Sequence, residues 1–317
     1  MRTWLIAIGA LLLALGVIAY WGLIDGAAPA RAEGEFDLAA YRALVANDAH
    51  ETLPTAVRAE FVGESEAPGF AAEAGAFNAG MRTFTYGGFQ IAAPGGDIVI
   101  DAGVDASTLA TMTDDEGSFD AAAYQRLLDG ATNAAHVLIT HEHLDHVMAV
   151  TRHPAPDVVA PRLRLTSAQL AGLPEHAPGG VLAPSIAAVA PVDFTAPQRI
   201  APGIVAVAAP GHSAGTIAIY VKTIAREYLF IGDIAWMMSS IEHLQGRPRA
   251  ISLILPNVDP DRPAVLRQLR ALHDLTAAEP NLVLVPAHDA DYLHELVESG
   301  VIEGQFAPAR SEAPAIP

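Results

Sequence analysis

The sequence contains no cysteine, and this absence excludes disulfide bonds, thiolate nucleophiles and every metal site built on cysteine. Any bound metal must therefore be held by histidine and carboxylate side chains. Basic residues are also scarce, with 18 Lys and Arg against 36 Asp and Glu, which gives a formal net charge of −18. A chain of this charge repels phosphate backbones, so we expect no nucleic-acid partner.

One long apolar segment stands at the N-terminus. The run Trp4–Ile24 has 21 positions without a charge, and a helix of that length spans about 31 Å, the thickness of one bilayer core. Arg2 is the only charge before this run, and acidic residues dominate after it, so a retained segment places the N-terminus in the cytoplasm and the rest outside. Residues 1–32 are thus predicted to be a signal anchor or a signal peptide.

These two interpretations give different locations. A retained anchor holds an exported protein in the inner membrane, facing the periplasm, whereas cleavage releases it as a periplasmic or secreted protein. Small residues at Ala28, Ala30 and Ala32 have the spacing of a cleavage site. The apolar run is nevertheless long against the roughly 7–15 residues of a signal peptide, which favours the anchor.

The remaining chain is predicted to form an N-terminal extension (33–80), an α/β domain (81–305) and a flexible tail (306–317). The full chain of 317 residues is 51% hydrophobic, which is ample for a buried core. In the extension, a short helix over Phe36–Val45 precedes a stretch whose Gly and Pro exclude a long regular element. From residue 81 onward strands and helices alternate, which predicts an α/β fold. The expected elements are a hairpin of Thr83–Ala92 and Asp97–Ile100, a helix at Phe119–Leu128, strands at His136–Thr140, Ile204–Ala208, Thr216–Val221, Glu227–Ile231 and Leu282–Val285, a further apolar run at Ile251–Leu255, and a helix at Arg262–Ala278.

The residues that carry chemistry are concentrated in one short segment after a predicted strand. Side chains alternate in an extended loop, so His141 and His143 point the same way and can reach one ion. Asp145 and His146 stand at the entry to a predicted helix over Val147–Arg152 and face a second ion nearby. Histidine and carboxylate without thiolate form the ligand set of a zinc, manganese or iron site.

Three further candidates follow apolar strands. His212 lies in a Gly-rich turn after Ile204–Ala208, Asp233 follows the next strand but one, and His288 follows Leu282–Val285. Sites in α/β proteins collect at the ends of such strands. We therefore expect these three side chains to join the histidine cluster.

With these residues in this order, the sequence resembles the metallo-β-lactamase superfamily, whose motifs are an Asp after a first strand, HxHxDH, a Gly-His loop, a Gly-Asp turn and a late His. The first Asp is Asp101, and the resemblance covers residues 81–300. It implies an α/β (α+β) fold, a four-layer αββα sandwich, with two divalent ions at one edge: zinc foremost, iron or manganese as alternatives. The implied ligands are His141, His143 and His212 for the first ion, Asp145, His146 and His288 for the second, and Asp233 as the bridge.

The resemblance also implies a metal-dependent hydrolase, in which two ions generate a bridging hydroxide and polarise the bond that it attacks. Asp145 is the candidate catalytic residue, because its carboxylate can orient the hydroxide or take up its proton. Asp101 is expected behind the ligands, and Ser213 and Tyr228 are candidates for contact with a small-molecule substrate.

Comparison with other members of the superfamily reduces the number of possible substrate classes. Asp233 and the lack of cysteine disfavour the classical β-lactamases, and a single lysine, Lys222, disfavours a thioesterase that holds glutathione through basic residues. A small lactone or ester-type carbonyl compound is therefore expected, with the apolar run Ile234–Met238 beside the site. Two alternatives stay open: a small-molecule phosphodiesterase, and a non-catalytic binding protein tethered to a membrane.

Overall fold

Two β-sheets packed face to face form the centre of the structure, a computed structural model that describes residues 2–255 and 257–308. The first sheet has the strand order β12-β1-β2-β3-β5-β6, with β4 paired to β1, and the second has the order β11-β10-β9-β8-β7. The strands are β1 (Ala56–Pro68), β2 (Met81–Ala92), β3 (Ile98–Ile100), β4 (Ser118–Phe119), β5 (His136–Leu138), β6 (Leu163–Arg164), β7 (Gln198–Ala201), β8 (Ile204–Ala208), β9 (Ile217–Lys222), β10 (Glu227–Gly232), β11 (Leu282–Pro286) and β12 (Glu303–Gly304).

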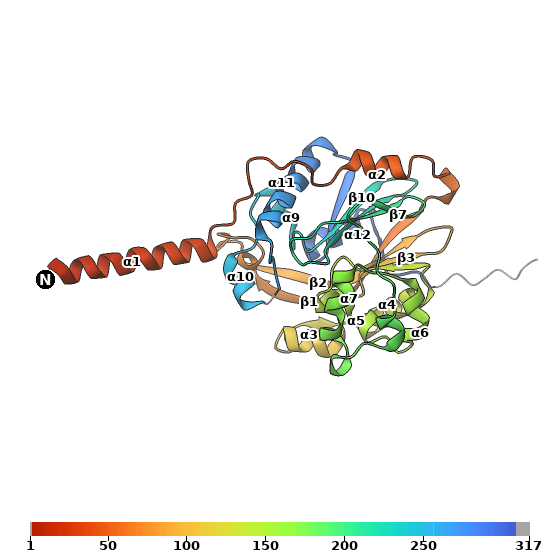
Figure 1. Cartoon of the computed structure of the whole chain (residues 1–317), viewed down its shortest axis with the longest axis horizontal. Coiled ribbons are helices and arrows are strands. Elements are labelled where there is room, and N and C mark those ends of the chain that lie inside the picture. The colour runs from red at the N-terminus through yellow and green to blue at the C-terminus, as the bar shows by residue number, and fades with distance from the viewer. Residues whose placement is uncertain (1, 256, 309–317) are drawn as a thin grey trace, which may run out of the picture.

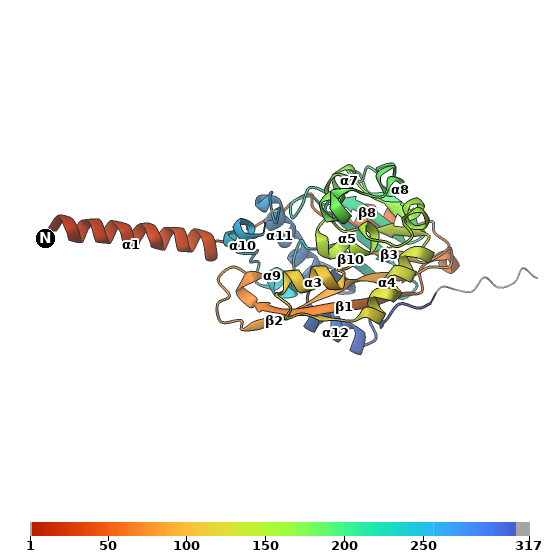
Figure 2. The same cartoon turned by 90° about the horizontal axis from the view of Figure 1, so that it is seen from below.

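Helices cover the outer faces of both sheets (Figures 1 and 2). The α-helices are α1 (Arg2–Leu23), α2 (Leu38–Leu44), α3 (Ala106–Met112), α4 (Ala121–Asn133), α5 (Leu144–Thr151), α6 (Pro156–Val159), α7 (Ser167–Gly172), α8 (Pro184–Ala187), α9 (Met238–Glu242), α10 (Arg249–Ile254), α11 (Arg262–Ala278) and α12 (Ala290–Glu298). Short 3₁₀ turns are η1 (His50–Thr52), η2 (Gly69–Ala71), η3 (Ala160–Arg162), η4 (Leu173–His176) and η5 (Pro178–Gly180).

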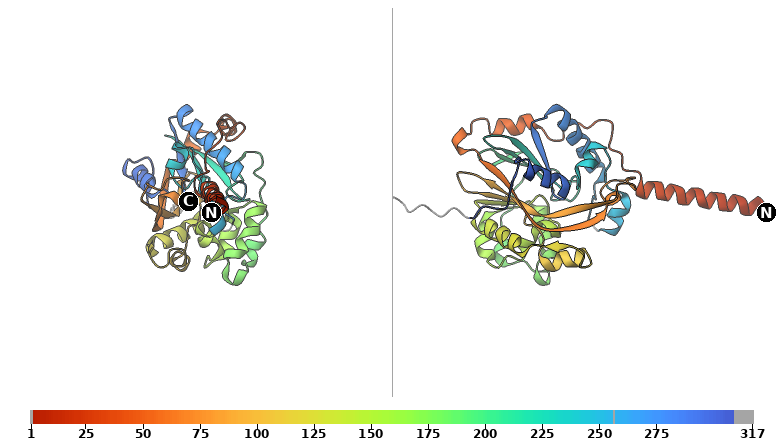
Figure 3. Two further views of the ribbon diagram at one scale, coloured as in Figure 1. Left: turned by 90° about the vertical axis from the view of Figure 1, so that its left-hand side faces the viewer. Right: turned by 180° about the vertical axis from the view of Figure 1, so that it is seen from behind.

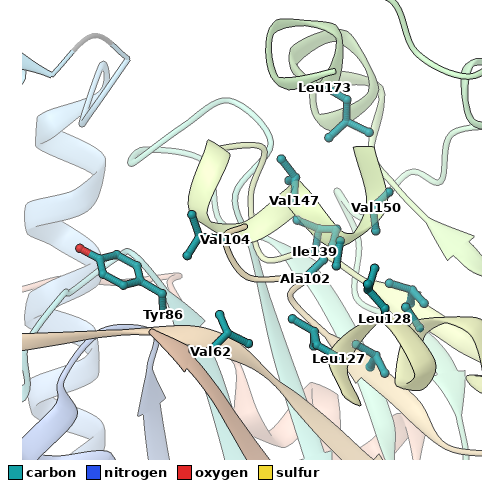
Figure 4. Packing of buried hydrophobic residues seen from close by; sticks show 14 of the residues in the cluster. Val62, Tyr86, Ala102, Val104, Leu127, Leu128, Ile139, Val147, Val150 and Leu173 are labelled. Carbon is teal, nitrogen blue, oxygen red and sulfur yellow. The ribbon is translucent and has the colours of Figure 1, made fainter. Parts of the chain in front are cut away.

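Three buried apolar clusters lie between these layers. The first packs the first sheet against α3, α4 and α5, and Figure 4 shows Val62 of β1 facing Leu127 of α4 in this cluster. The second fills the space between the two sheets, with Ile98 from one and Ile219 from the other. The third packs the second sheet against α2 and α11. Three such interfaces require four layers, so the predicted αββα sandwich is confirmed.

Several elements match their predictions because local signals fix their ends. Helix α11 has the predicted bounds: Asp261 accepts a hydrogen bond from the N–H of Ala264 as N-cap, and a proline occupies its first turn. Helix α4 begins at Ala121, later than predicted, because Asp120 caps it. Strands β2 and β3 form the expected antiparallel hairpin.

The structure differs from the sequence prediction between residues 33 and 80. We expected no long regular element there, but β1 is a strand of 13 residues that pairs with β2. The register shifts between Phe61 and Gly63, and Gly87 lies opposite this bulge, where an added Cβ would clash with the carbonyl oxygen of Glu60. Pairing with β2 stabilises β1, and this long-range contact leaves little signal in the local sequence.

The two ends of the chain differ in how they relate to this body. Helix α1 projects away from it (Figures 1 and 3), and its stretch Thr3–Leu23 is long and apolar enough to cross a membrane. At the other end, Phe306 is buried and its N–H donates to Glu60 at 2.8 Å. The chain is therefore still packed where the predicted tail begins, and residues 309–317 of that tail lie outside the described residues.

Candidate metal centre

All seven predicted metal ligands lie together in the structure. They come from the segments that follow β5, β8, β10 and β11, so the expected gathering at strand ends is present. His143 and Asp145 are partly exposed. The other ligands are at most 3% exposed and are His141, His146, His212, Asp233 and His288.

The first group of ligands converges on His143. Nε2 of His141 and Nε2 of His212 each lie 3.0 Å from Nδ1 of His143. Oδ2 of Asp233 completes the group at 3.6 Å from Nε2 of His141 and 3.4 Å from Nε2 of His212. Three nitrogens and one carboxylate oxygen thus face one point, the arrangement of a four-coordinate site.

The second group lies on the other side of Asp233. Nε2 of His146 and Nε2 of His288 lie 3.3 Å apart, and Oδ1 of Asp233 lies 3.3 Å and 3.0 Å from them. Oδ2 of Asp145 is 3.3 Å from Nε2 of His288. Because Oδ2 of Asp233 faces the first group and Oδ1 the second, this carboxylate has the geometry of a bridge.

Asp233 is held in this position by its neighbours. The indole Nε1 of Trp236 donates to Oδ2 of Asp233 at 2.7 Å. Gly232, just before it, has φ of 49°, and a Cβ there would lie 2.7 Å from the side chain of Thr140. Only glycine fits this close approach without strain, which explains the Gly-Asp pair at the end of β10.

Acceptors behind three imidazoles fix which ring nitrogen faces the centre. Nδ1 of His146 lies 3.0 Å from Asp101, Nδ1 of His212 lies 3.0 Å from Asp259, and Nδ1 of His288 lies 2.9 Å from the carbonyl oxygen of Thr85. A proton on Nδ1 satisfies each acceptor and leaves the Nε2 lone pair directed inward. Asp101 therefore occupies the position expected for it behind the ligands.

These contacts provide a test of whether divalent ions fit the site. Inward lone pairs on His146 and His288 at 3.3 Å repel one another, and either a proton or a metal ion between the two nitrogens relieves this repulsion. Three carboxylates, from Asp101, Asp145 and Asp233, surround the same rings, and buried negative charge needs a counter-charge. Nitrogen and oxygen donors without sulfur also match the preference of zinc, iron and manganese. The residues present fit two divalent ions.

Burial and charge shift the ionisation of the site in two directions. Burial lowers the pKa of His141 well below its usual value and lowers the pKa of His143 to about 4, so both rings are neutral donors at pH 7. Burial also acts on His146, but the charges of Asp101, Asp145 and Asp233 raise its pKa well above the usual value. The second group therefore attracts positive charge more strongly than the first.

A cleft of about 860 Å³ opens over the centre. Of the ligands, His143, Asp145, Asp233 and His288 line it. Its other walls combine apolar side chains with acidic ones, and no Lys or Arg among the described residues lines it. The principal apolar side chains are Phe84, Tyr86, Trp236, Ile251 and Leu255, and the acidic ones are Glu66, Glu116, Glu142 and Glu175.

Tyr86 brings a hydroxyl group to this cleft. Its ring lies 5.3 Å from the ring of His288, and its hydroxyl is 2.9 Å from Oγ of Ser65. Figure 4 shows the hydroxyl directed away from the aliphatic side chains of the first cluster, which lie to the right of Tyr86 in this view. Burial raises the pKa of Tyr86 to about 12, so the phenol keeps its proton at neutral pH and can donate it in a hydrogen bond.

Of the two residues expected to contact substrate, Ser213 and Tyr228, only Ser213 lies at the cleft. Ser213 lines the cleft and donates to Glu142 at 2.9 Å. The expectation for Tyr228 is wrong: it is buried between the sheets, and its hydroxyl donates to the carbonyl oxygen of Val301 at 2.6 Å. Sequence position alone gave no indication that Tyr86, on β2, takes a place at the site.

The run Ile234–Met238 lines the cleft only through Trp236. Ile234 and Ala235 are buried in the cluster beneath the second sheet, and Met237 is buried in the first cluster. Most of the run packs in the core, so the run as a whole does not form an apolar wall of the cleft. The chain turns tightly after β10, so only one of the five side chains reaches the cleft.

Asp259 and Arg247 are functional neighbours that the sequence did not indicate. Asp259 lies 3.0 Å from His212 and forms a buried ion pair with Arg247, whose guanidinium stands 4.7 Å above the ring of Trp236. Burial disfavours the Asp259 carboxylate, yet Arg247 and His212 hold its pKa far below the usual range. Neither residue belongs to a recognisable motif, and only their place in the fold connects them to the ligands.

Comparison with known proteins shows which solved structures share this fold. No protein-family model matches the chain, and no curated protein has significant sequence similarity to it. Among solved structures, a probable metal-dependent hydrolase from Staphylococcus aureus superposes with a TM-score of 0.56 at 15% identity, covering 74% of this chain and 90% of that one.

Two further solved structures are similar to this chain. An AiiA variant from B. thuringiensis, with N-decanoyl-L-homoserine bound at its active site, has a TM-score of 0.55 at 13% identity and covers 77% of this chain and 96% of its own. AidC, a dizinc quorum-quenching lactonase, has a TM-score of 0.50 at 12% identity and covers 73% and 86%. These similarities and the arrangement of the two sheets show that the chain has the fold of the metallo-β-lactamase superfamily.

Proposed function

We propose that the protein is a metal-dependent hydrolase that acts on a small lactone or ester. One observation carries the proposal: two ligand groups share Asp233 at the base of an open cleft. The proposed ligands are His141, His143 and His212 for one ion, Asp145, His146 and His288 for the other, and Asp233 for both. Zinc is the first candidate metal, because the similar lactonase AidC is a dizinc protein.

The chemistry follows from the chain's own groups around this pair of sites. Bound divalent ions supply a nucleophile from water at neutral pH and polarise the carbonyl group. In the hydrolysis of a lactone, water adds to the acyl carbon, the acyl carbon–oxygen bond breaks, and the ring oxygen leaves with a proton as the alcohol of a hydroxy acid. We assign the acceptance of the water's proton to the Asp145 carboxylate, which lines the cleft beside the second group.

We assign to the Tyr86 hydroxyl the role of a hydrogen-bond donor to the substrate. It keeps its proton at neutral pH and lies in the cleft next to His288, so it can donate a hydrogen bond to the carbonyl or leaving oxygen. A hydrogen bond that strengthens as negative charge develops on that oxygen lowers the barrier. Tyr86 thus complements Asp145, which handles the proton of the attacking water.

The charge of the cleft favours a carbonyl substrate over a phosphodiester. Phosphate groups are held by Arg, Lys or backbone N–H groups, and no Lys or Arg among the described residues lines the cleft, whereas four glutamates do. Apolar walls suit an acyl group. The acyl-homoserine bound to AiiA and the acyl-homoserine product bound to AidC are consistent with this substrate class.

We further propose that α1 is a retained membrane anchor. Residues just after it are built into the body: the carbonyl oxygen of Gly26 accepts from the N–H of Gly246 at 2.8 Å, and the carboxylate of Asp25 pairs with Arg249 at 2.9 Å. Cleavage after Ala30 or Ala32 would remove these contacts. An exported body held at the inner membrane is the arrangement that keeps them.

The metal part of this proposal is tested by elemental analysis of the purified protein. We expect close to two divalent ions per chain, and Asp233→Ala should lose most of the second ion because both groups share that carboxylate. Thermal midpoints before and after chelation give a second readout, since an ion at 100 times its dissociation constant stabilises the fold by about 2.7 kcal/mol. Full loading at one ion, unaffected by Asp233→Ala, contradicts a dinuclear site.

The substrate part is tested on the metal-replete protein with matched compounds. An acyl lactone, a carboxylic ester and a phosphodiester are compared by kcat/KM, and we expect the lactone or the ester to be preferred. A phosphodiester preference of tenfold or more, about 1.4 kcal/mol in the barrier, would overturn the assignment. Absence of turnover with every compound, despite two bound ions, would favour the binding protein instead.

A further inference from the structure

An unusual set of exposed apolar side chains surrounds the point where α1 meets the body. Among the described residues outside α1, five large apolar side chains are more than half exposed. Four of them, Phe77, Met81, Leu253 and Ile254, lie on two segments next to that point, and the fifth is Val181. We call these four residues and Leu255, which is 44% exposed, the membrane-side patch.

Both segments of the patch are bonded to the end of α1. The N–H of Gly75, two residues before Phe77, donates to the carbonyl oxygen of Leu23 at 2.9 Å. Residues 27 and 245 form an isolated β-bridge just before α10, the helix that carries Leu253 and Ile254. Figures 1 and 2 show α10 directly beside the end of α1. The patch therefore lies where the chain leaves the apolar helix.

Trp21 indicates the depth of α10 relative to a bilayer. Tryptophan near the end of an apolar span prefers the boundary between the acyl chains and the headgroups. The guanidinium of Arg249, the first residue of α10, lies 5.2 Å from the ring of Trp21. A six-residue helix is about 9 Å long, so Leu253 and Ile254 lie within one short helix length of this boundary.

The same helix forms a wall of the metal cleft. Ile251 and Leu255 line the cleft, whereas Leu253 and Ile254 are 75% and 73% exposed on the outside. Ala71, in the turn before the Phe77 loop, also lines the cleft. The cleft is thus bounded by the elements that carry the membrane-side patch.

From these observations we propose that the membrane-side patch inserts into the bilayer interface, so that the cleft receives amphiphilic substrates with an acyl chain directly from the lipid phase. The occupant of the patch is lipid, because it continues the surface of a helix that can span a membrane. The body has a formal net charge of −19 over residues 33–317, so apolar contact, and not attraction to anionic headgroups, drives the insertion. The substrate class rests on the proposed hydrolase function; the docking does not.

Docking is tested on the full chain in phosphatidylcholine nanodiscs, and the lack of native cysteine makes single labels unambiguous. Leu253→Cys, Ile254→Cys and Phe77→Cys carry a nitroxide, with Val181→Cys as the control, because it is 72% exposed and adjoins α8, away from α1 (Figure 2). We expect the three patch labels to collide with oxygen and to be shielded from a water-soluble nickel chelate. Patch labels as accessible to the chelate as the label at 181 would overturn the docking.

Entry from the lipid phase is tested with two acyl lactones, one short and water-soluble and one long and dissolved in the bilayer. For the double variant Leu253→Asp, Ile254→Asp we expect kcat/KM to fall tenfold or more for the long lactone and to stay within twofold for the short one. Val181→Asp should change neither value. Equal effects on both lactones overturn the entry route, whereas hydrolysis of neither lactone by the wild type refutes the proposed function and leaves the label experiment to decide the docking.

Discussion

Among single residues, Asp259 combines two roles that make it sensitive to substitution. Its side chain is 1% exposed, it pairs with Arg247, which is 2% exposed, and it accepts from Nδ1 of His212. Removing one member of such a pair leaves the other charge buried without a partner. The same removal frees the imidazole of His212 to rotate or to change its protonated nitrogen.

We therefore predict that Asp259→Ala lowers the free energy of unfolding by about 3–5 kcal/mol and weakens metal binding by about 10–100-fold. Urea unfolding measures the first quantity, and competition with a chelator of known affinity measures the second. Asp274→Ala is the control, because Asp274 pairs with Arg270 but is 55% exposed, and its loss should cost less than about 0.5 kcal/mol. Equal effects of the two substitutions would show that the buried pair has neither role.

Asp48, which is not part of the metal centre, gives a prediction about how the stability of the fold depends on pH. Its Oδ2 accepts from the N–H of Gly203 at 2.7 Å and its Oδ1 from Nε of Arg199 at 3.0 Å. Burial disfavours the carboxylate, but these donors hold the pKa of Asp48 below its usual value. A lowered folded pKa stabilises the fold above the unfolded value of about 3.9, and this contribution disappears as the pH falls through the folded pKa.

Asp48→Asn should thus lower the free energy of unfolding by about 1 kcal/mol at pH 7, because Arg199 is partly exposed and its interaction is screened. The difference between wild type and variant should shrink toward zero as the pH falls below the unfolded value and through the lower folded pKa of Asp48. Urea unfolding of both proteins across this range is the measurement. A difference that is the same at pH 7 and pH 3 would mean that the ionised carboxylate contributes nothing.

At the scale of elements, the bulge between β1 and β2 depends on one glycine. A Cβ on Gly87 would meet the backbone of Glu60, which cannot move away as a flexible side chain can. We predict that Gly87→Ala destabilises the fold by about 1–3 kcal/mol or more. Gly95, in the β2–β3 turn, has nothing within 4 Å of an added Cβ, so Gly95→Ala is the matched control and should be close to neutral in thermal unfolding. A neutral Gly87→Ala would show that the bulge is not needed.

The elements also show which parts of the fold the sequence could predict. Helix α11 and strand β8 have the predicted bounds, because a capping Asp, a Pro and an unbroken apolar run are local signals. Strand β1 was missed, because polar and small residues in Ala56–Pro68 are stabilised by pairing with β2 and not by their own pattern. The run Ile251–Leu255 falls on α10, which is held beside α1 by tertiary contacts.

The same distinction applies to the candidate site. The residues proposed as metal ligands stand in compact motifs at strand ends, and the structure brings all of them together. Tyr86, Arg247 and Asp259 come from segments without a motif and reach the site only through sheet topology and loop packing. Sequence patterns thus predicted that the proposed ligands converge, whereas the groups that lie behind them or beside them in the cleft became visible only in the three-dimensional arrangement.

On the scale of the whole molecule, a chain of buried contacts connects the base of α1 to the metal centre. The guanidinium of Arg262 donates to the carbonyl oxygens of Asp25 and Arg247, and Arg247 in turn pairs with Asp259 behind His212. Arg262 is 6% exposed, so these hydrogen bonds are shielded from water. The residues that directly follow α1 are therefore part of the packed body and not a free linker.

This arrangement gives a prediction about topology. Arg2 precedes the apolar run and acidic residues follow it, so the positive-inside rule places the N-terminus in the cytoplasm and the body outside. An alkaline phosphatase fused after residue 317 should be active in cells, and deletion of residues 4–24 should abolish its activity. The fusion should also stay in the membrane pellet after carbonate extraction and keep its N-terminal residues in mass spectrometry, because α1 is not removed. A soluble fusion that begins near residue 31 or 33 would contradict the retained anchor. An inactive but intact fusion would show that the body lies on the cytoplasmic side, opposite to the predicted orientation.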